Sequence, residues 1–161
     1  MGCDIHMYRE RRVNGVWETD TLKEANDPAD PTYYDFESGM RSGGRDYYLF
    51  AILSGVRSYG PMSIAPPAED RGFPDDVTDI NNDCKEQWDS DGHSHGYLDM
   101  AELSALIEKY HQAPVLHEPT ARDDFGYAHQ VLCQLKENAH ARGYFAGLEP
   151  EDCRILFFYD N

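Results

Sequence analysis

Two short segments of the chain repeat one arrangement, an acid and an imidazole separated by a single residue. They are Asp4-Ile5-His6 and Asp91-Gly92-His93. Side chains two positions apart on a strand share a face, and a glycine lets a loop curl so that its neighbours converge. If the two pairs met, their nitrogen and oxygen atoms would suit Zn²⁺, Mn²⁺ or Fe²⁺. The pattern therefore predicts a divalent-metal site with Asp4, His6, Asp91 and His93 as ligands.

Two other residues could complete such a site. His95 follows His93 by two positions and is our candidate for the catalytic general base, although it could also be a further ligand. Asp160 ends the C-terminal apolar run and could be a metal ligand if that run lies beside the first strand. The alternatives remain open, because Asp4 and His6 also suit a solvent-facing strand and Asp91-Gly92 also suits a turn.

A second group of residues is suited to anions. Gly43 and Gly44 precede an apolar helix, and glycines free the backbone amides at a helix start to close on a phosphate. Arg45 and Arg57 could hold a phosphate or carboxylate through their guanidinium groups, and Tyr8 could stack on a nucleobase. The competing interpretation is that the glycines only start the helix and the arginines pair with nearby acids.

The elements that must position these residues can be predicted from the apolar pattern. Residues 3–13 alternate and return through Asn14-Gly15 into residues 16–19, which predicts a hairpin with Cys3, Ile5 and Met7 inside. Asp4, His6 and Tyr8 then share the opposite face. The continuous apolar run at residues 154–159 predicts a central strand covered on both sides.

Helices are predicted at four places. One spans about residues 45–54, one follows Pro74 with an apolar stripe ending at Trp88, one starts at an Asp99/Glu102 capping box, and one spans about residues 121–142. Residues 22–44 and 58–74 are expected to be long loops. The fold class is therefore one α+β domain over residues 1–161, with a mixed or antiparallel sheet that includes the N-terminal hairpin and the C-terminal strand.

The net charge limits the classes of molecule that the chain can bind. The formal net charge is −16, which disfavours long nucleic acids and anionic membranes because both require clustered Lys and Arg. A small anionic ligand in a local pocket and a basic protein partner both stay open.

No apolar run is long enough to span a bilayer, and the start of the chain has no signal-peptide pattern, so we expect a cytoplasmic protein. The four cysteines contain no C-x-x-C pair and are expected to be reduced and buried. The pattern does not predict an oligomeric state.

The chain also resembles a family of small proteins of tailed phages and prophages. The segments that carry the resemblance are MGCDIH, NGVW, RDYYLFAILSGVR, RGFPDDV, DGHSHGYL and RILFFYDN, in order along the whole chain. Tyr97 departs from the tryptophan that the family has there. The resemblance implies a phage-derived protein in the cytoplasm of a bacterial host and no particular activity. Its segments include Asp4, His6, Arg45, Arg57, Asp91, His93 and Asp160.

These observations lead to three hypotheses about function, of which the one ranked last is an acidic mimic or adaptor that binds a basic host protein, because such a protein would not need the acid-imidazole pairs. The first is a metal-dependent hydrolase acting on a small phosphoester or nucleotide, with the metal lowering the pKa of bound water. The second is a non-catalytic phage accessory protein, such as an anti-defence protein, that sequesters a small nucleotide signal or binds a host protein.

Overall fold

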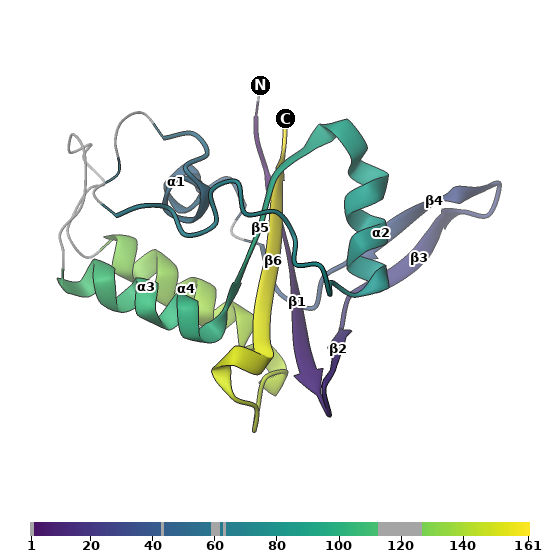
Figure 1. The fold of residues 1–161 in the computed structure, drawn as a ribbon. Coiled ribbons are helices and arrows are strands. Elements are labelled where there is room, and N and C mark those ends of the chain that lie inside the picture. The colour runs from purple at the N-terminus through teal and green to yellow at the C-terminus, as the bar shows by residue number, and fades with distance from the viewer. Residues whose placement is uncertain (1, 43, 59–61, 63, 113–126) are drawn as a thin grey trace.

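A computed structural model describes residues 2–42, 44–58, 62, 64–112 and 127–161. Its centre is a four-stranded antiparallel sheet in the order β2-β1-β6-β5 (Figure 1). The strands are β1 (Ile5–Val13), β2 (Val16–Thr19), β5 (Gly92–Asp99) and β6 (Cys153–Asp160). The predicted α+β class, the four helices and the sheet that includes both chain ends are confirmed.

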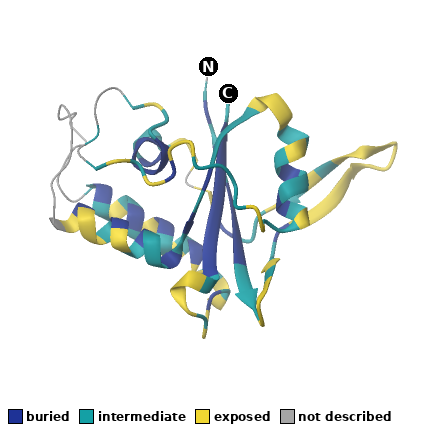
Figure 2. Cartoon of the chain, in the orientation of Figure 1, coloured by how far each residue is buried: buried dark blue, intermediate teal, exposed yellow. Residues whose placement is uncertain are grey.

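Strand β6 occupies the middle of the sheet, as its apolar run predicts. It pairs with β1 on one side and β5 on the other, and its residues from Cys153 to Tyr159 are all buried (Figure 2). The predicted β1–β2 hairpin is also present. Asn14 and Gly15 have φ values of 51° and 78°, the left-handed pair that a tight two-residue hairpin turn requires.

Each face of the sheet has its own apolar cluster. Ile5, Met7 and Phe157 belong to the larger cluster, which is covered by α1 (Tyr47–Ser54), α3 (Met100–Gln112) and α4 (Tyr127–Ala139). Tyr8 and Phe158 belong to the smaller one, which is covered by α2 (Asp79–Trp88). The face that carries Asp4, His6 and Tyr8 is therefore a second packed layer.

Local signals explain where the helices start and stop. In the capping box of α3, the Asp99 amide donates to Glu102 at 2.9 Å and the Glu102 amide donates to Asp99 at 2.7 Å. Gly55 ends α1 with a φ of 72°. Helix α4 ends at Ala139, three residues short of the predicted end, and residues 121–126 lie outside the described residues. No helix in the described ranges is long and apolar enough to cross a membrane.

Three strands lie where the sequence indicates a break or a loop. Strand β5 covers the last five residues of the Asp89–Gly96 segment that we expected to be a break between helices, because polar side chains occupy positions that still pair with β6. The predicted loop at 22–44 is wrong over much of its length. It contains β3 (Leu22–Asp27) and β4 (Asp30–Glu37), which form a separate two-stranded sheet. All of β3 is exposed, and in β4 only Tyr34 and Phe36 are partly buried. The described part of 58–74 contains no helix or strand, as expected.

Candidate functional site

Most of the residues singled out by type gather at one end of the central sheet, where the two chain termini lie (Figure 1). The Asp160 amide donates to the Asp4 carbonyl at 3.1 Å, so the first and last strands close side by side. Gly92 pairs with Asp160, which brings the second acid-imidazole segment to the same end. The condition under which Asp160 could join the first acid-imidazole pair, that the C-terminal strand neighbours the first strand, is met.

Asp160 divides its carboxylate between two neighbours at this end. One oxygen accepts the Asp4 backbone amide at 2.8 Å, and the other lies 3.0 Å from His6 Nε2. The His6 ring packs between Phe158, with ring centroids 4.9 Å apart, and Trp88, with centroids 4.5 Å apart. His6 is therefore fixed from three sides, by one carboxylate and two aromatic rings.

Asp4 points its carboxylate at Arg45. Both carboxylate oxygens accept from the guanidinium, at 2.7 and 3.0 Å, and this hydrogen bond lowers the pKa of Asp4. The pair is exposed, so water screens its energy and it contributes little to stability. Arg45 therefore follows the second of the two interpretations of the arginines, in which they pair with nearby acids and do not hold a phosphate.

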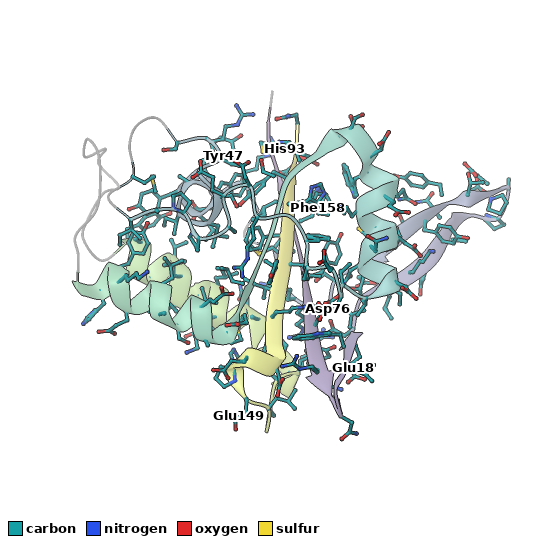
Figure 3. All side chains as sticks on the ribbon, viewed as in Figure 1. Glu18, Tyr47, Asp76, His93, Glu149 and Phe158 are labelled. Atoms are coloured by element: carbon teal, nitrogen blue, oxygen red, sulfur yellow. The ribbon has the colours of Figure 1, made fainter. Side chains whose placement is uncertain are left out.

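The two acid-imidazole pairs end on different faces of the sheet. His6 is opposite Phe158 in the register, on the α2 face, whereas His93 is opposite Tyr159, on the face of the larger cluster. The His93 and Tyr159 ring centroids are 6.1 Å apart, and Figure 3 shows His93 and Phe158 as separate positions along the sheet. Asp91 is exposed in the short 3₁₀ turn before β5. The expected meeting of His6 with His93 in one pocket is therefore wrong.

A bulge in β5 puts His93 and His95 on opposite faces of the sheet. The register advances three residues, from His93 to Gly96, while β6 advances only two, from Tyr159 to Phe157. Ser94 takes up the extra residue with a φ of 50°. His95 consequently faces the α2 side, although a regular strand would place it on the same face as His93.

His95 is packed into the aromatic layer of the α2 face. Its ring stacks on Phe158 at 5.2 Å and meets Phe73 edge-on at 5.2 Å. Burial, followed by the positive charge of Lys85 and the neighbouring His93, lowers the pKa of His95 to about 4. Its Nε2 atom is buried with no partner among the described residues, which does not favour the predicted role as a general base for a bound substrate.

The predicted anion site at the start of α1 is already occupied by a side chain of the protein. Asp46 caps the helix and accepts the amides of Tyr48 at 3.1 Å and Leu49 at 3.2 Å. These are the N–H groups that a phosphate would need. Gly44 has a φ of 62°, a left-handed conformation that glycine adopts readily, so this glycine is explained by the turn before the helix. Gly43 lies outside the described residues.

Arg57 and Tyr8 lie in different surroundings. Arg57 Nη2 is 3.5 Å from the Asn161 side chain, and its guanidinium lies 5.7 Å from the centre of the Tyr47 ring. Tyr8 is buried beneath α2, with its hydroxyl 3.2 Å from Cys84 Sγ. Tyr8 is therefore a core residue, and the prediction that it stacks on a ligand is wrong.

No three His, Cys, Asp or Glu side chains within the described part of the chain are already arranged around a common metal position. At the sheet end the acids are paired with His6, Arg45 and a backbone amide. These contacts therefore hold the N-terminal and C-terminal residues of the chain together. The divalent metal and the small anionic ligand stay predictions from the sequence.

The surface that sequence reasoning missed is the β3–β4 hairpin, residues 22–37, which we call the acidic arm. It projects past α2, away from the central sheet (Figure 1), and nearly all of it is exposed (Figure 2). Lys23 is its only Lys or Arg. Its acids are Glu24, Asp27, Asp30, Asp35 and Glu37.

The acidic arm is fastened to α2 by polar contacts and to the smaller apolar cluster by Phe36. The Gln87 side chain accepts the Tyr34 amide at 2.9 Å and donates to the Tyr34 carbonyl at 2.8 Å. Lys23 binds Asp83 at 2.8 Å and lies 4.2 Å from the centre of the Tyr34 ring. An isolated two-stranded hairpin is marginal in water, so these contacts give the arm a defined position.

Further acids extend this surface onto the helix that holds the arm. Asp79 and Glu86 of α2, and Asp89 and Asp91 at its end, are all exposed. Tyr33 on β4 is 51% exposed, an aromatic ring displayed among carboxylates. The only sequence feature that marks this surface is the group of acids and tyrosines in residues 22–37. The same composition is typical of a polar loop, so it does not predict a hairpin.

Comparisons of the chain with protein-family models, with curated proteins and with solved structures return no match.

Proposed function

We propose that this chain is a non-catalytic binding protein whose acidic arm docks on a basic surface of a partner protein. The observation that carries the proposal is the arm itself, a projecting and largely solvated hairpin rich in acids and fastened to the body. Its charge has no matching cluster of Lys or Arg on the arm. A complementary positive surface would therefore supply both attraction and orientation.

The side chains of the arm suit protein recognition. Tyrosines are enriched at the centres of protein interfaces, because they give a large contact area and a polar tip at small entropic cost. Tyr33 is exposed in this way, whereas Tyr34 is held against Lys23 and Gln87. An exposed tyrosine on an arm rich in acids fits a partner that offers arginines and lysines beside an apolar patch.

The resemblance to tailed-phage proteins suggests that the partner is a protein of the bacterial host. The hydrolase hypothesis has less support, because the charged groups at the sheet end are satisfied by one another. Hydrolysis of a phosphoester and binding of a small nucleotide stay predictions without a geometric argument in their favour.

The partner can be identified by a crosslinker placed on the arm. Tyr33→p-benzoylphenylalanine would be expressed in bacterial cells and irradiated, and the crosslinked protein identified by mass spectrometry. The same substitution at Tyr144, a half-buried residue on the body, gives the background. The purified partner is then titrated with the chain by calorimetry.

Charge variants then decide whether the arm is responsible. The arm variant is Glu24→Gln, Asp35→Asn and Glu37→Gln. Three rim charges worth about 0.5 kcal/mol each would weaken binding roughly tenfold. The matched control removes the same charge from exposed acids of the body, Glu137, Glu149 and Glu151.

The control variant should bind within about twofold of the original chain. Equal affinity of the arm and control variants, or a partner whose contact surface is acidic, would reject the proposal.

A further inference from the structure

Within the described residues, one edge of the acidic arm is open. The arm consists of β3 and β4, paired with each other in a sheet of two strands, so each strand has one outer edge (Figure 1). On the outer edge of β4, Gln87 of α2 binds both the amide and the carbonyl of Tyr34. Pro31, also in β4, has no N–H to donate. The open edge is therefore that of β3.

The register of the arm identifies the backbone groups on this edge. Tyr34 directs its N–H and C=O to Gln87, so Tyr34 and its partner Ala25 are not hydrogen-bonded to each other. Ala25 then directs its own N–H and C=O outward, and the alternation of an antiparallel ladder does the same for Lys23. In the part of the chain that the structure describes, no loop, helix or side chain bonds to these groups.

The side chains beside this edge indicate what would complement it. Lys23 turns toward Asp83 of α2, so its neighbours Leu22 and Glu24 share the opposite face of β3. Both are exposed, Leu22 by 54%. Opposite charges on adjacent strands stabilise a sheet, and like charges destabilise it. A strand with an apolar residue beside Leu22 and a Lys or Arg beside Glu24 therefore fits this face.

A second copy of the chain does not fit the same edge. Pairing β3 with β3 would bring together two arms that each carry five acids and a single lysine. That lysine, Lys23, is already bound to Asp83 at 2.8 Å. The charge of the arm therefore favours a basic strand from another protein.

The edges of the central sheet are better protected than that of β3. Strand β2, at one edge, has only four residues. At the other edge the His95 carbonyl of β5 accepts the Gly72 amide at 2.9 Å. Short strands and covered edges are common ways to prevent pairing with another chain. Strand β3 has six residues, all exposed, and is the more accessible template.

We propose that an extended, basic segment of the partner protein pairs with β3 and adds a third strand to the acidic arm. Lys23 and Ala25 each donate one backbone hydrogen bond to this segment and accept one from it. In this mode of recognition the main-chain bonds supply affinity, and the side chains beside the edge supply specificity. The inference rests on the proposed function, because it specifies how the arm meets its partner.

A synthetic peptide tests the pairing without the natural partner. The probe is acetyl-TKTVTKT-amide, whose lysines and valine share one face when the peptide is extended. In NMR spectra of the isotope-labelled chain, the amide signals of Lys23 and Ala25 should shift and saturate as peptide is added. No shift in the arm at a large excess of peptide would overturn the inference. The crosslinking search for the partner would be unaffected, so this failure and that of the proposed function are distinguishable.

A proline closes the edge and keeps every charge of the arm. Ala25→Pro removes an outward N–H that takes no part in the β3–β4 ladder, a position where edge strands tolerate proline. It should weaken peptide binding at least about tenfold, since a backbone bond is lost and the ring obstructs the incoming strand. Ala25→Thr keeps the N–H and is the matched control, with binding within about twofold of the original chain. Equal binding by the two variants would mean that charge alone attracts the peptide, which overturns the pairing and leaves the proposed function standing.

A second measurement needs no substitution. With saturating peptide, exchange of the Lys23 and Ala25 amides in the original chain should slow at least about threefold, because a bonded amide exchanges only when the strands separate. The amides of β2 are the reference and should exchange as in the free chain. Unchanged exchange at both Lys23 and Ala25 would contradict the pairing even if Ala25→Pro failed to fold.

Discussion

At the end of the central sheet, the charged side chains form hydrogen bonds with one another and the aromatic rings stack. Asp160 joins the first strand to the last through the Asp4 amide and His6, and Arg45 holds Asp4 from the side of α1. The rings of His6 and His95 both stack on Phe158, from the two strands that flank it. These residue types suit a metal site, but here they bind the two chain ends to the core.

The spacing of residues could predict part of this arrangement. His6 does lie on the first strand, which the alternation predicts, and Asp160 does end the strand that the apolar run predicts. That these two strands are neighbours is known only from the structure. The faces of His93 and His95 could not be predicted. A single extra residue at Ser94 reverses the orientation of the side chains after it, and the sequence around a bulge differs little from that of a regular strand.

The buried imidazole of His95 should make stability depend on pH. Its pKa of about 4 lies below the ordinary value of 6.5, so the unfolded chain binds the proton first as the pH falls. The contribution of neutral His95 to the free energy of unfolding is complete above pH 6.5 and is lost as the pH falls toward 4. Between about pH 7.5 and pH 5 this should cost about 1–2 kcal/mol of unfolding free energy.

Urea unfolding of His95→Gln at the two pH values tests this. The variant should lose less stability on acidification than the original chain, by that same amount. His140→Gln, at an exposed histidine, should behave as the original chain does. Identical pH dependence in all three proteins would show that His95 is not the group responsible.

At the scale of elements, strong local signals predict structure well and solvated hairpins poorly. The Asn14-Gly15 turn, the capping box of α3 and the apolar run of β6 each carry a physical requirement that few other conformations meet. The acidic arm lacks any such requirement. Most of its residues are exposed. The contacts that fix it are the packing of Phe36 on the smaller apolar cluster and the bonds from Gln87 and Asp83, which are distant in sequence.

Gln87 should control the order of the acidic arm. Gln87→Ala removes the side chain that bonds both backbone groups of Tyr34, so exchange of the arm amides should become faster by at least about fivefold. Global stability should fall by less than about 1 kcal/mol, because few apolar contacts are lost.

Hydrogen exchange by mass spectrometry resolves these two effects. Gln134→Ala, at an exposed glutamine of α4 that bonds only its neighbour Asn138 in the described contacts, serves as the control. Unchanged exchange of the arm in Gln87→Ala would mean that other contacts hold it.

The capping box gives a separate prediction for the start of α3. Asp99→Ala leaves the Glu102 amide without its partner and should lower the free energy of unfolding by about 1 kcal/mol. Asp75→Ala, at an exposed acid outside the helices, should change it by less than about 0.5 kcal/mol. Thermal unfolding followed by circular dichroism distinguishes the two, and equal stabilities would contradict this role for the cap.

At the scale of the whole molecule, the chain separates a tightly packed body from a charged projection. The body has apolar clusters on both faces of one sheet, while much of the −16 net charge lies at the surface. Self-repulsion of this size favours solubility and disfavours compactness. A projecting acidic arm fastened by polar contacts is more readily explained by recognition of a positive surface than by the needs of the fold.

Amide protection in the complex is the most direct test of the claim that the arm is the docking surface. Hydrogen exchange would be compared for the chain alone and for the chain saturated with the partner that crosslinks at position 33. Protection should be concentrated in residues 22–37 and the exposed face of α2, with exchange in α3 and α4 unchanged. Protection confined to the sheet end or to the α3–α4 pair, with the arm exchanging as in the free chain, would contradict it.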